Sequence, residues 1–156
     1  MIDSFIENIN ITTASFKITS STCAMKNSVF KNIRGDLEAE LLLVNLDSNL
    51  IIESLNFSDS SSSLLMSRNS VITINKLYAD SINTDKSIIQ ISESEYAKID
   101  DIEIVSVSVK SKQSIIAISD SMNVKISNLN SRNNDETVIS LISSTIEGID
   151  TLAVQN

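Results

Sequence analysis

The chain repeats a short pattern along almost its whole length, and this repetition constrains the fold more than any other feature. The stretch SIIQISESEYAKIDDI (residues 87–102) returns 27 positions later as SIIAISDSMNVKISNL (residues 114–129), with eight of the sixteen positions identical. Sequence periods of about 20–50 residues are typical of solenoid proteins. A four-residue cassette (apolar, polar, polar, Ile or Leu) occurs seven times, starting at Ile6, Phe30, Ile52, Ile74, Ile99, Ile126 and Ile149.

A second apolar strip comes eight residues before each of the last five cassettes. Its anchors are Val44, Met66, Ile91, Ile118 and Leu141. The length variation falls after the cassette, where surface loops tolerate insertions at small entropic cost. A constant spacing indicates that each strand stacks on its equivalent in the next coil, at the separation of neighbouring β-strands. We therefore predict two strands joined by a fixed polar bend, followed by a variable connection.

The two polar residues of each cassette interrupt the period-two alternation of a strand and predict a tight corner. Asn and Asp tolerate the left-handed backbone region that such a corner uses. Stacked Asn and Ser side chains can also hydrogen-bond along the axis. The second polar residues of the seven cassettes are Asn8, Asn32, Ser54, Lys76, Asp101, Asn128 and Thr151.

The pattern SIIxIS-x-S-x-NVxISNL resembles the coils of right-handed parallel β-helix proteins of the pectin-lyase-like kind, especially their Ser/Asn/Ile-rich surface-protein repeats. The resemblance covers residues 5–154. It implies three short strands per coil, a two-residue corner at Ser127–Asn128 and variable loops at the third turn. We predict an all-β, right-handed parallel β-helix of six to seven uncapped coils of 22–27 residues. Residues 1–156 would form one domain, either a segment of a longer chain or a filament subunit.

Two alternatives share parts of this pattern. Leucine-rich repeats have a similar period, but they have one strand per repeat and the second strip argues against them. Residues 35–46 (GDLEAELLLVNL) are rich in helix-favouring residues. Val44 nevertheless falls on the repeat grid, so we predict a strand there.

The composition excludes several kinds of chemistry. The chain has no His, which removes the commonest general base and every His-containing triad. Cys23 is the single cysteine, so an intrachain disulfide is impossible. The net charge of −8 argues against nucleic-acid binding, and apolar runs of about four residues are too short for a membrane span. Residues 1–13 lack the features of a signal peptide.

The acidic cluster of Asp100, Asp101 and Glu103 is the best candidate site. Carboxylate oxygens are ligands that Ca²⁺ prefers, and the resemblance implies carboxylates on the outer face in polysaccharide lyases and hydrolases of this fold. The competing interpretation is a solvated acidic corner. Two sequons, beginning at Asn10 and Asn56, match the N-glycosylation pattern.

Together these features favour a non-catalytic structural or display element: a rigid stalk or fibre at the cell surface or outside the cell. It would self-associate or continue into further coils by coil-on-coil stacking, and no cofactor, catalytic residue, nucleic acid or direct membrane insertion is expected. The alternative is a protein that binds or cleaves polysaccharide in an outer-face groove formed by the variable loops. An intracellular scaffold is a third hypothesis, because a signal peptide is missing.

Overall fold

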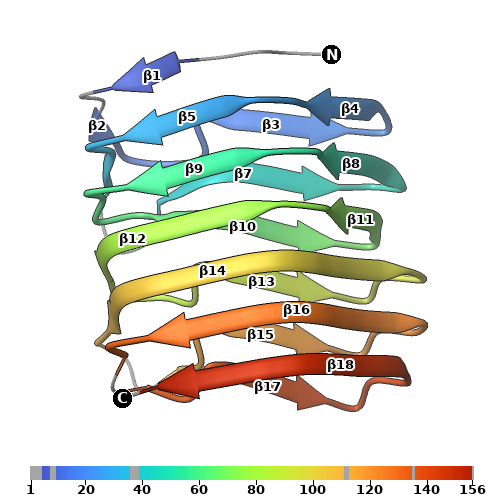
Figure 1. Ribbon diagram of the computed structural model, residues 1–156. Helices are drawn as coiled ribbons and strands as arrows, with labels where there is room; N and C mark the ends of the chain where they lie inside the picture. Colours follow the sequence, from blue (N-terminus) through green and yellow to red (C-terminus); the bar gives the residue numbers. More distant parts are fainter. Residues whose placement is uncertain (1–4, 8–9, 36–38, 111–112, 135, 156) are drawn as a thin grey trace.

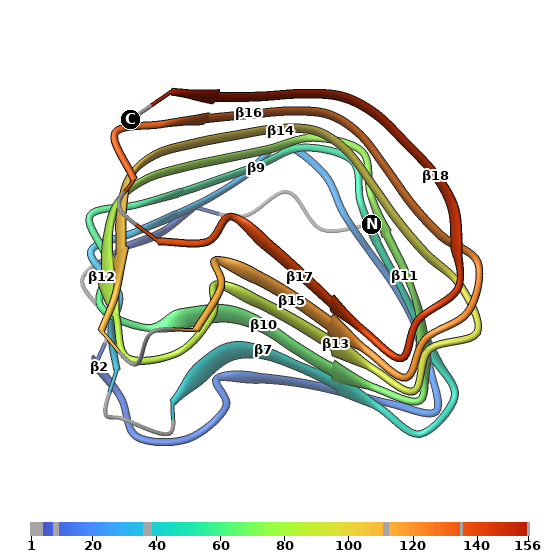
Figure 2. The same ribbon diagram turned by 90° about the horizontal axis from the view of Figure 1, so that it is seen from below.

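The computed structural model describes residues 5–7, 10–35, 39–110, 113–134 and 136–155. Across these residues the protein is an all-β solenoid of about six turns, without any helix, and its coils stack through parallel strands (Figure 1). Seen along the stack, successive coils follow similar outlines (Figure 2). The predicted parallel β-helix architecture is therefore confirmed.

Strands on three faces surround the core. The first face is a six-stranded sheet, and the second and third faces belong to one ten-stranded sheet that bends around a corner. A separate pair, β2 (Asn10–Ile11) and β6 (Arg34–Gly35), forms a two-stranded sheet. The strands of the first face are β3 (Phe16–Thr19), β7 (Glu40–Asn45), β10 (Ser63–Arg68), β13 (Ile89–Ser92), β15 (Ile116–Ser119) and β17 (Ile139–Ile142).

The ten-stranded sheet changes character along the stack. In the early coils the second and third faces have separate strands, whereas in the later coils one strand runs through both faces. The second face has β4 (Thr22–Met25), β8 (Ser48–Ile52) and β11 (Ser70–Ile74), and the third has β1 (Phe5–Glu7), β5 (Ser28–Lys31), β9 (Leu55–Ser58) and β12 (Leu77–Thr84). The strands that run through both are β14 (Ala97–Val109), β16 (Val124–Arg132) and β18 (Ile146–Gln155).

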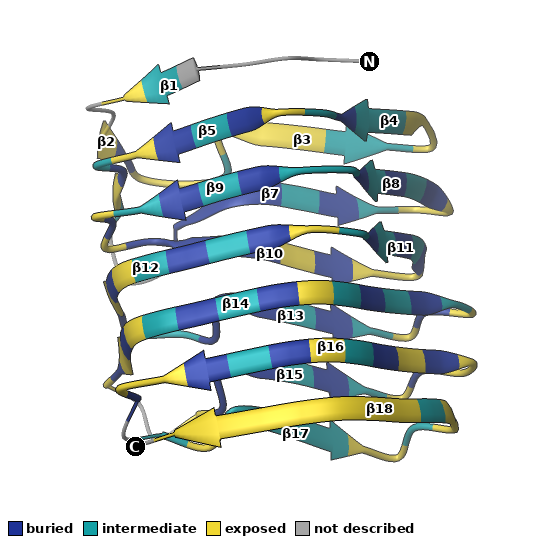
Figure 3. Ribbon diagram, viewed as in Figure 1, coloured by how far each residue is buried: buried dark blue, intermediate teal, exposed yellow. Residues whose placement is uncertain are grey.

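Apolar side chains form columns inside the solenoid because equivalent residues of successive coils pair directly. β-Branched residues suit these positions, since their restricted χ1 fits a pleated, tightly packed surface. Ile126 is fully buried, whereas Ile149 in the last coil is 45% exposed. Figure 3 shows the same contrast between strands, because β16 contains buried segments and β18 is exposed along most of its length. The column that Ile126 and Ile149 belong to, here called the isoleucine column, consists of Met25, Ile52, Ile74, Ile99, Ile126 and Ile149.

The corner between the second and third faces uses left-handed backbone in the later coils, as predicted. Asp101, Asn128 and Thr151 have φ values of 52°, 50° and 49°. Ser54 and Lys76, at the same corner of earlier coils, do not have positive φ. The strand pairs on the two sides of these left-handed residues keep the same register, so β14, β16 and β18 turn the corner together.

The first two cassettes lie at a different corner from the other five, so their predicted phase is wrong. Phe30 pairs with Phe57, and Ile6 pairs with Phe30, which places both at the end of the third face. The true equivalent of Ile52 in the preceding coil is Met25. Asn32 still has a left-handed φ of 52°, because this second corner also uses left-handed polar residues. Asn8 lies outside the described residues.

The strip anchor at Met66 is also wrong by one position. Ser67 pairs with Val44 and Ile91 and is buried, whereas Met66 points outward. From Ser67 to Ile74 the chain advances seven residues, against eight from Val44 to Ile52, so the bend in this coil is one residue shorter. The predicted strand around Val44 is confirmed as β7.

A serine follows each strand of the first face, and four of these six serines hydrogen-bond to the serine of the next coil. The serine ladder comprises Ser21, Ser48, Ser70, Ser94, Ser121 and Ser144. Backbone N–H groups of Ser21, Ser48, Ser94 and Ser121 donate to the Oγ atoms of Ser48, Ser70, Ser121 and Ser144 at 3.2–3.4 Å. Each hydroxyl also donates to a carbonyl within its own bend. These bonds satisfy backbone donors that the bend would otherwise leave unpaired.

Candidate functional site

A groove of about 580 Å³ lies on the outer side of the first face, along β10, β13, β15 and β17. Its outward-facing floor follows the register from Met66 through Gln90 and Ala117 to Ser140. Small residues in the later coils leave space between the sheet and the loops that precede its strands. The remaining lining residues are Ser67, Ser87, Ile91, Ser92, Gln113, Ser114, Ile118, Ser119, Thr137 and Ile142.

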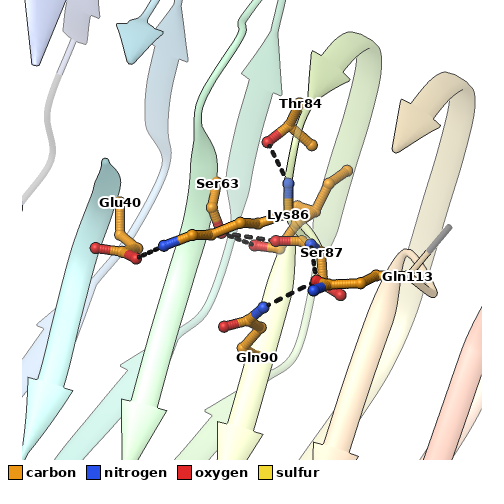
Figure 4. A network of polar contacts seen from close by, with 8 residues as sticks. Glu40, Ser63, Thr84, Lys86, Ser87, Gln90 and Gln113 are labelled. Carbon is orange, nitrogen blue, oxygen red and sulfur yellow. Dashed lines mark hydrogen bonds and ion pairs between the residues drawn. The ribbon is translucent and has the colours of Figure 1, made fainter. Parts of the chain in front are cut away.

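Two glutamines from neighbouring coils project along one wall of the groove. The Nε2 group of Gln90 donates to Oε1 of Gln113 at 3.3 Å, and the backbone N–H of Ser87 donates to the same oxygen at 3.3 Å (Figure 4). Among the described residues that line the groove, none is Asp, Glu, Lys or Arg. The groove therefore presents neutral amide and hydroxyl groups beside a few apolar side chains.

A polar network holds the loop that forms this wall. Ser63 Oγ donates to the carbonyls of Ser87 and Ile88 at 2.7 and 3.2 Å. Lys86 donates from its Nζ to Glu40 Oε1 at 2.8 Å, reaching across the coil that contains Ser63 (Figure 4). Only 19% of the Lys86 side chain and 9% of the Glu40 side chain are exposed. The pair thus links segments 46 residues apart in a largely desolvated setting.

The predicted acidic cluster divides among different partners. Asp100 lies at the corner of β14 and accepts hydrogen bonds from Ser127 Oγ at 2.8 Å and Asn128 Nδ2 at 2.9 Å. Lys98 Nζ lies 3.4 Å from the Asp100 carboxylate and donates to Asn75 of the preceding coil at 3.2 Å. This arrangement connects three successive coils at one corner.

The other two carboxylates of the cluster face elsewhere. Asp101 lies 3.9 Å from Lys76 Nζ in the preceding coil, and Glu103 is paired with Arg132 in the following coil. Within the described part of the chain, no group of three or more His, Cys, Asp or Glu residues could hold a metal ion. The structure therefore places Asp100, Asp101 and Glu103 in three separate inter-coil contacts.

The environment of Asp100 gives a testable pH dependence. Hydrogen bonding from Ser127 chiefly lowers the pKa of Asp100 below 3.8, with further lowering by Asn128 and Lys98 against the opposing effect of burial. Because the folded-state pKa is depressed, the ionised Asp100 carboxylate stabilises the folded protein. This stabilisation is fully present above the pKa of an unfolded carboxyl group, about 3.9. It is lost as the pH falls through the lowered folded-state pKa.

Replacing Ser127→Ala is expected to raise the pKa of Asp100 toward 3.8, because the main hydrogen-bond donor is removed. A ¹³C NMR titration of the side-chain carboxyl measures this change. Ser119→Ala removes a hydroxyl on the first face and serves as the control. An Asp100 pKa that is the same in wild type and Ser127→Ala would contradict the assigned cause.

The remaining predicted residues occupy scattered positions. Cys23 is a free thiol, partly buried, at an inward position that pairs with Leu50. Asn10 is exposed in β2, whereas Asn56 lies in β9 beside Tyr78, with its Oδ1 atom buried and unpaired. The glycosylation of either asparagine stays a prediction. Gln90, Gln113 and the Glu40–Lys86 pair were not predicted, because no local motif marks them.

The last described coil presents an apolar surface at the C-terminal end of the stack. Its inward columns continue in β17 and β18 but have no described coil beyond them (Figure 3). The exposed large apolar residues of β18 are Ile146, Ile149, Leu152 and Val154. The parallel ladder therefore ends in an edge that is apolar inside and has no described strand paired to its outer side.

The fold and these surfaces define the chain as a parallel β-solenoid repeat protein. No family model, curated protein or solved structure significantly matches it. No helix that is long and apolar enough to cross a membrane is found in the portion that the structure describes.

Proposed function

We propose that this chain is a non-catalytic structural or display element, a rigid stalk or fibre segment outside the cell or at its surface. The observation that carries the proposal is the apolar end surface of β17 and β18. The inward columns end in exposed residues in β18 and in partly buried residues in β17, whereas their equivalents in the coils above are buried, as for Ile149 and Ile126. Covering Ile, Leu or Val fully contributes about 1.5–3 kcal/mol per side chain. Stacking of a further coil is the arrangement that covers all columns at once.

Ion pairs between neighbouring coils on the outer surface of the solenoid support the same proposal. The ion pairs Lys26–Glu53, Arg68–Glu93 and Lys76–Asp101 each join two neighbouring coils. Exposed pairs of this kind contribute little individually, about 0–1 kcal/mol. Their geometry, together with the serine ladder, favours one register between coils and so a straight, stiff stack.

Analytical ultracentrifugation of the 156-residue chain over a range of concentrations, with electron microscopy, tests coil stacking. The wild type is expected to form end-to-end particles that lengthen with concentration. Ile149→Asp should stay monomeric, because a carboxylate in the isoleucine column cannot be covered without losing its hydration. Ile142→Asp is the matched control, since Ile142 is 60% exposed but points outward from β17. A wild type that is monomeric at every concentration would contradict the proposal.

The neutral groove supports a second function, binding of an uncharged polysaccharide. Amide and hydroxyl groups can hydrogen-bond sugar hydroxyls, and Met66, Ala117 and Ile142 offer apolar contacts at the floor and ends. Asp100, Asp101 and Glu103 are not among the lining residues. The groove therefore favours binding over cleavage by these carboxylates.

A glycan array followed by calorimetry distinguishes this second function. Neutral glucans, mannans or galactans are expected to bind, and Gln113→Ala should weaken binding about tenfold by removing a hydrogen-bonding amide. Gln155→Ala, which changes an exposed glutamine of β18 away from the groove, is the control. Absence of binding to every glycan on the array would rule out this function.

A further inference from the structure

The first and last described coils carry opposite charge. Residues 1–34 contain four basic residues (Lys17, Lys26, Lys31 and Arg34) and two acidic residues, whereas residues 133–156 contain four acidic residues and no basic residue. The described members lie on the end coils, with Lys17 in β3, Lys31 in β5, and Glu147 and Asp150 in β18. Two copies of the chain therefore attract each other when unlike ends meet and repel when like ends meet.

On the outer surface of the solenoid, at the corner between the second and third faces, the strand register places specific charges opposite each other. Asp150 pairs with Ser127, which pairs with Asp100. Each of these residues directly follows a member of the isoleucine column, and Glu53 and Lys26 directly follow Ile52 and Met25 of that column, so they occupy the equivalent position at this corner. Lys26 Nζ already lies 2.9 Å from Glu53 in the next coil. A copy docked below the last coil would bring its own Lys26 beneath Asp150, which repeats this cation–carboxylate contact across the junction.

We propose that the last coil of one copy docks head to tail on the first coil of a second copy. In this junction Ile149 lies against Met25, and Asp150 lies against Lys26. The inference rests on the proposed coil stacking and adds to it the identity of the partner surface and the polarity of the assembly. All described strand pairs within the chain are parallel, and the head-to-tail arrangement keeps the new pairs parallel as well.

The short strand β1 occupies part of the docking surface. β1 pairs with Val29–Lys31 of β5. By the register of the third face, Leu152–Gln155 of an incoming copy would take the positions opposite Ser28–Lys31. Phe30, which pairs with Ile6 of β1, is fully buried, whereas Phe16 in β3 is 38% exposed. β1 therefore competes with the incoming strand for the same edge, and docking requires its release.

Charge-reversal variants of the full chain test the polarity by sedimentation velocity. Asp150→Lys and Lys26→Glu are each expected to raise the concentration for half-assembly about threefold to tenfold, because a weak attraction becomes a repulsion. Lys17→Glu gives a second variant of the N-terminal coil that leaves the Lys26–Glu53 contact intact. Combining Asp150→Lys with Lys26→Glu in one chain should restore assembly. Asp120→Lys, an exposed reversal between β15 and β16, is the matched control and should behave like the wild type.

The role of β1 has its own variant. Ile6→Asp weakens the packing of β1 on Phe30 and is expected to lower the concentration for half-assembly, provided that circular dichroism shows the same strand content. An Ile6→Asp chain that assembles less readily than the wild type would overturn the competition.

The outcomes separate this inference from the proposed function. The head-to-tail junction is overturned if none of the end charge reversals changes the concentration for half-assembly, or if assembly stops at tail-to-tail dimers. Coil stacking itself would still stand in either case. A wild-type chain that never assembles overturns both. Loss of assembly in Asp150→Lys together with recovery in the double reversal supports the junction.

Discussion

Ile52→Ala is expected to lower the free energy of unfolding by about 2–5 kcal/mol, because it removes a branched side chain from a fully packed site. Ile52 is buried in the isoleucine column, with Met25 above it and Ile74 below it. The cavity would lie between stacked strands whose spacing is fixed by backbone hydrogen bonds. The neighbouring coils therefore cannot move together to fill it. Equilibrium urea denaturation followed by far-ultraviolet circular dichroism measures the change.

The adjacent residue provides a control of identical chemistry. Ile51 lies on the same strand, β8, but is only partly buried and points to the outer side. Ile51→Ala should lower the free energy of unfolding by less than about 1 kcal/mol, since most of the lost surface was already hydrated. Equal losses in the two variants would contradict the assignment of inward and outward positions in this strand.

Lys86→Met is expected to lower the free energy of unfolding by about 3 kcal/mol. The substitution keeps the apolar stem but leaves the Glu40 carboxylate without its cation in a desolvated site. Breaking a buried pair by removing one partner typically costs about 3–5 kcal/mol, and the partial exposure of Lys86 favours the lower end. The measurement is again urea denaturation at neutral pH, with the slope compared to confirm a similar unfolding transition.

Two further variants isolate the charge effect. The double variant Glu40→Leu with Lys86→Met should recover most of the loss, because no unpaired charge remains buried. Lys110→Met breaks the exposed pair with Asp85 and should cost less than about 1 kcal/mol. If Lys86→Met and Lys110→Met destabilise the protein equally, the Glu40–Lys86 pair is not the desolvated link that its geometry indicates.

The stacking of coils could be predicted from the sequence because it depends on spacing that the chain repeats. Ile91, Ile99, Ile118 and Ile126 occur at the same intervals in two coils, and they pair as expected. Such a regular arrangement of β-branched residues has few solutions besides parallel strands stacked in register. The spacing of these isoleucines was therefore sufficient to predict the architecture, and turn signals from Gly or Pro were not needed.

The phase of the early coils could not be predicted because two corners of each coil have the same local signature. Phe30–Ile33 has an apolar residue, two polar residues and an apolar residue, and Asn32 is left-handed just as Asn128 is. The true cassette at Met25 ends in Ser28, which hides it from an apolar pattern. Only the pairing of Phe30 with Phe57 shows which corner is which.

The candidate site was harder to predict than the fold. The acidic run at residues 100–103 was visible as a cluster in the sequence, but the corner turns its side chains toward different coils. Gln90 and Gln113 are far apart in sequence and meet because two loops stack. Glu40 and Lys86 meet across an intervening coil. Contacts of this kind depend on loop paths, which the repeat pattern does not specify.

The similarity of residues 87–102 to residues 114–129, which match at eight of sixteen positions, also has a consequence for how such a chain can change in length. The strand pairs Ile89–Ile116 and Ile91–Ile118 join residues of the same type. The two coils therefore present the same inward side chains at these positions. A tandem duplication of 27 residues would insert a coil whose inward isoleucines pair with isoleucines in the coils on both sides. Gene duplication within this segment can therefore lengthen the solenoid by whole coils while every existing strand keeps an equivalent neighbour.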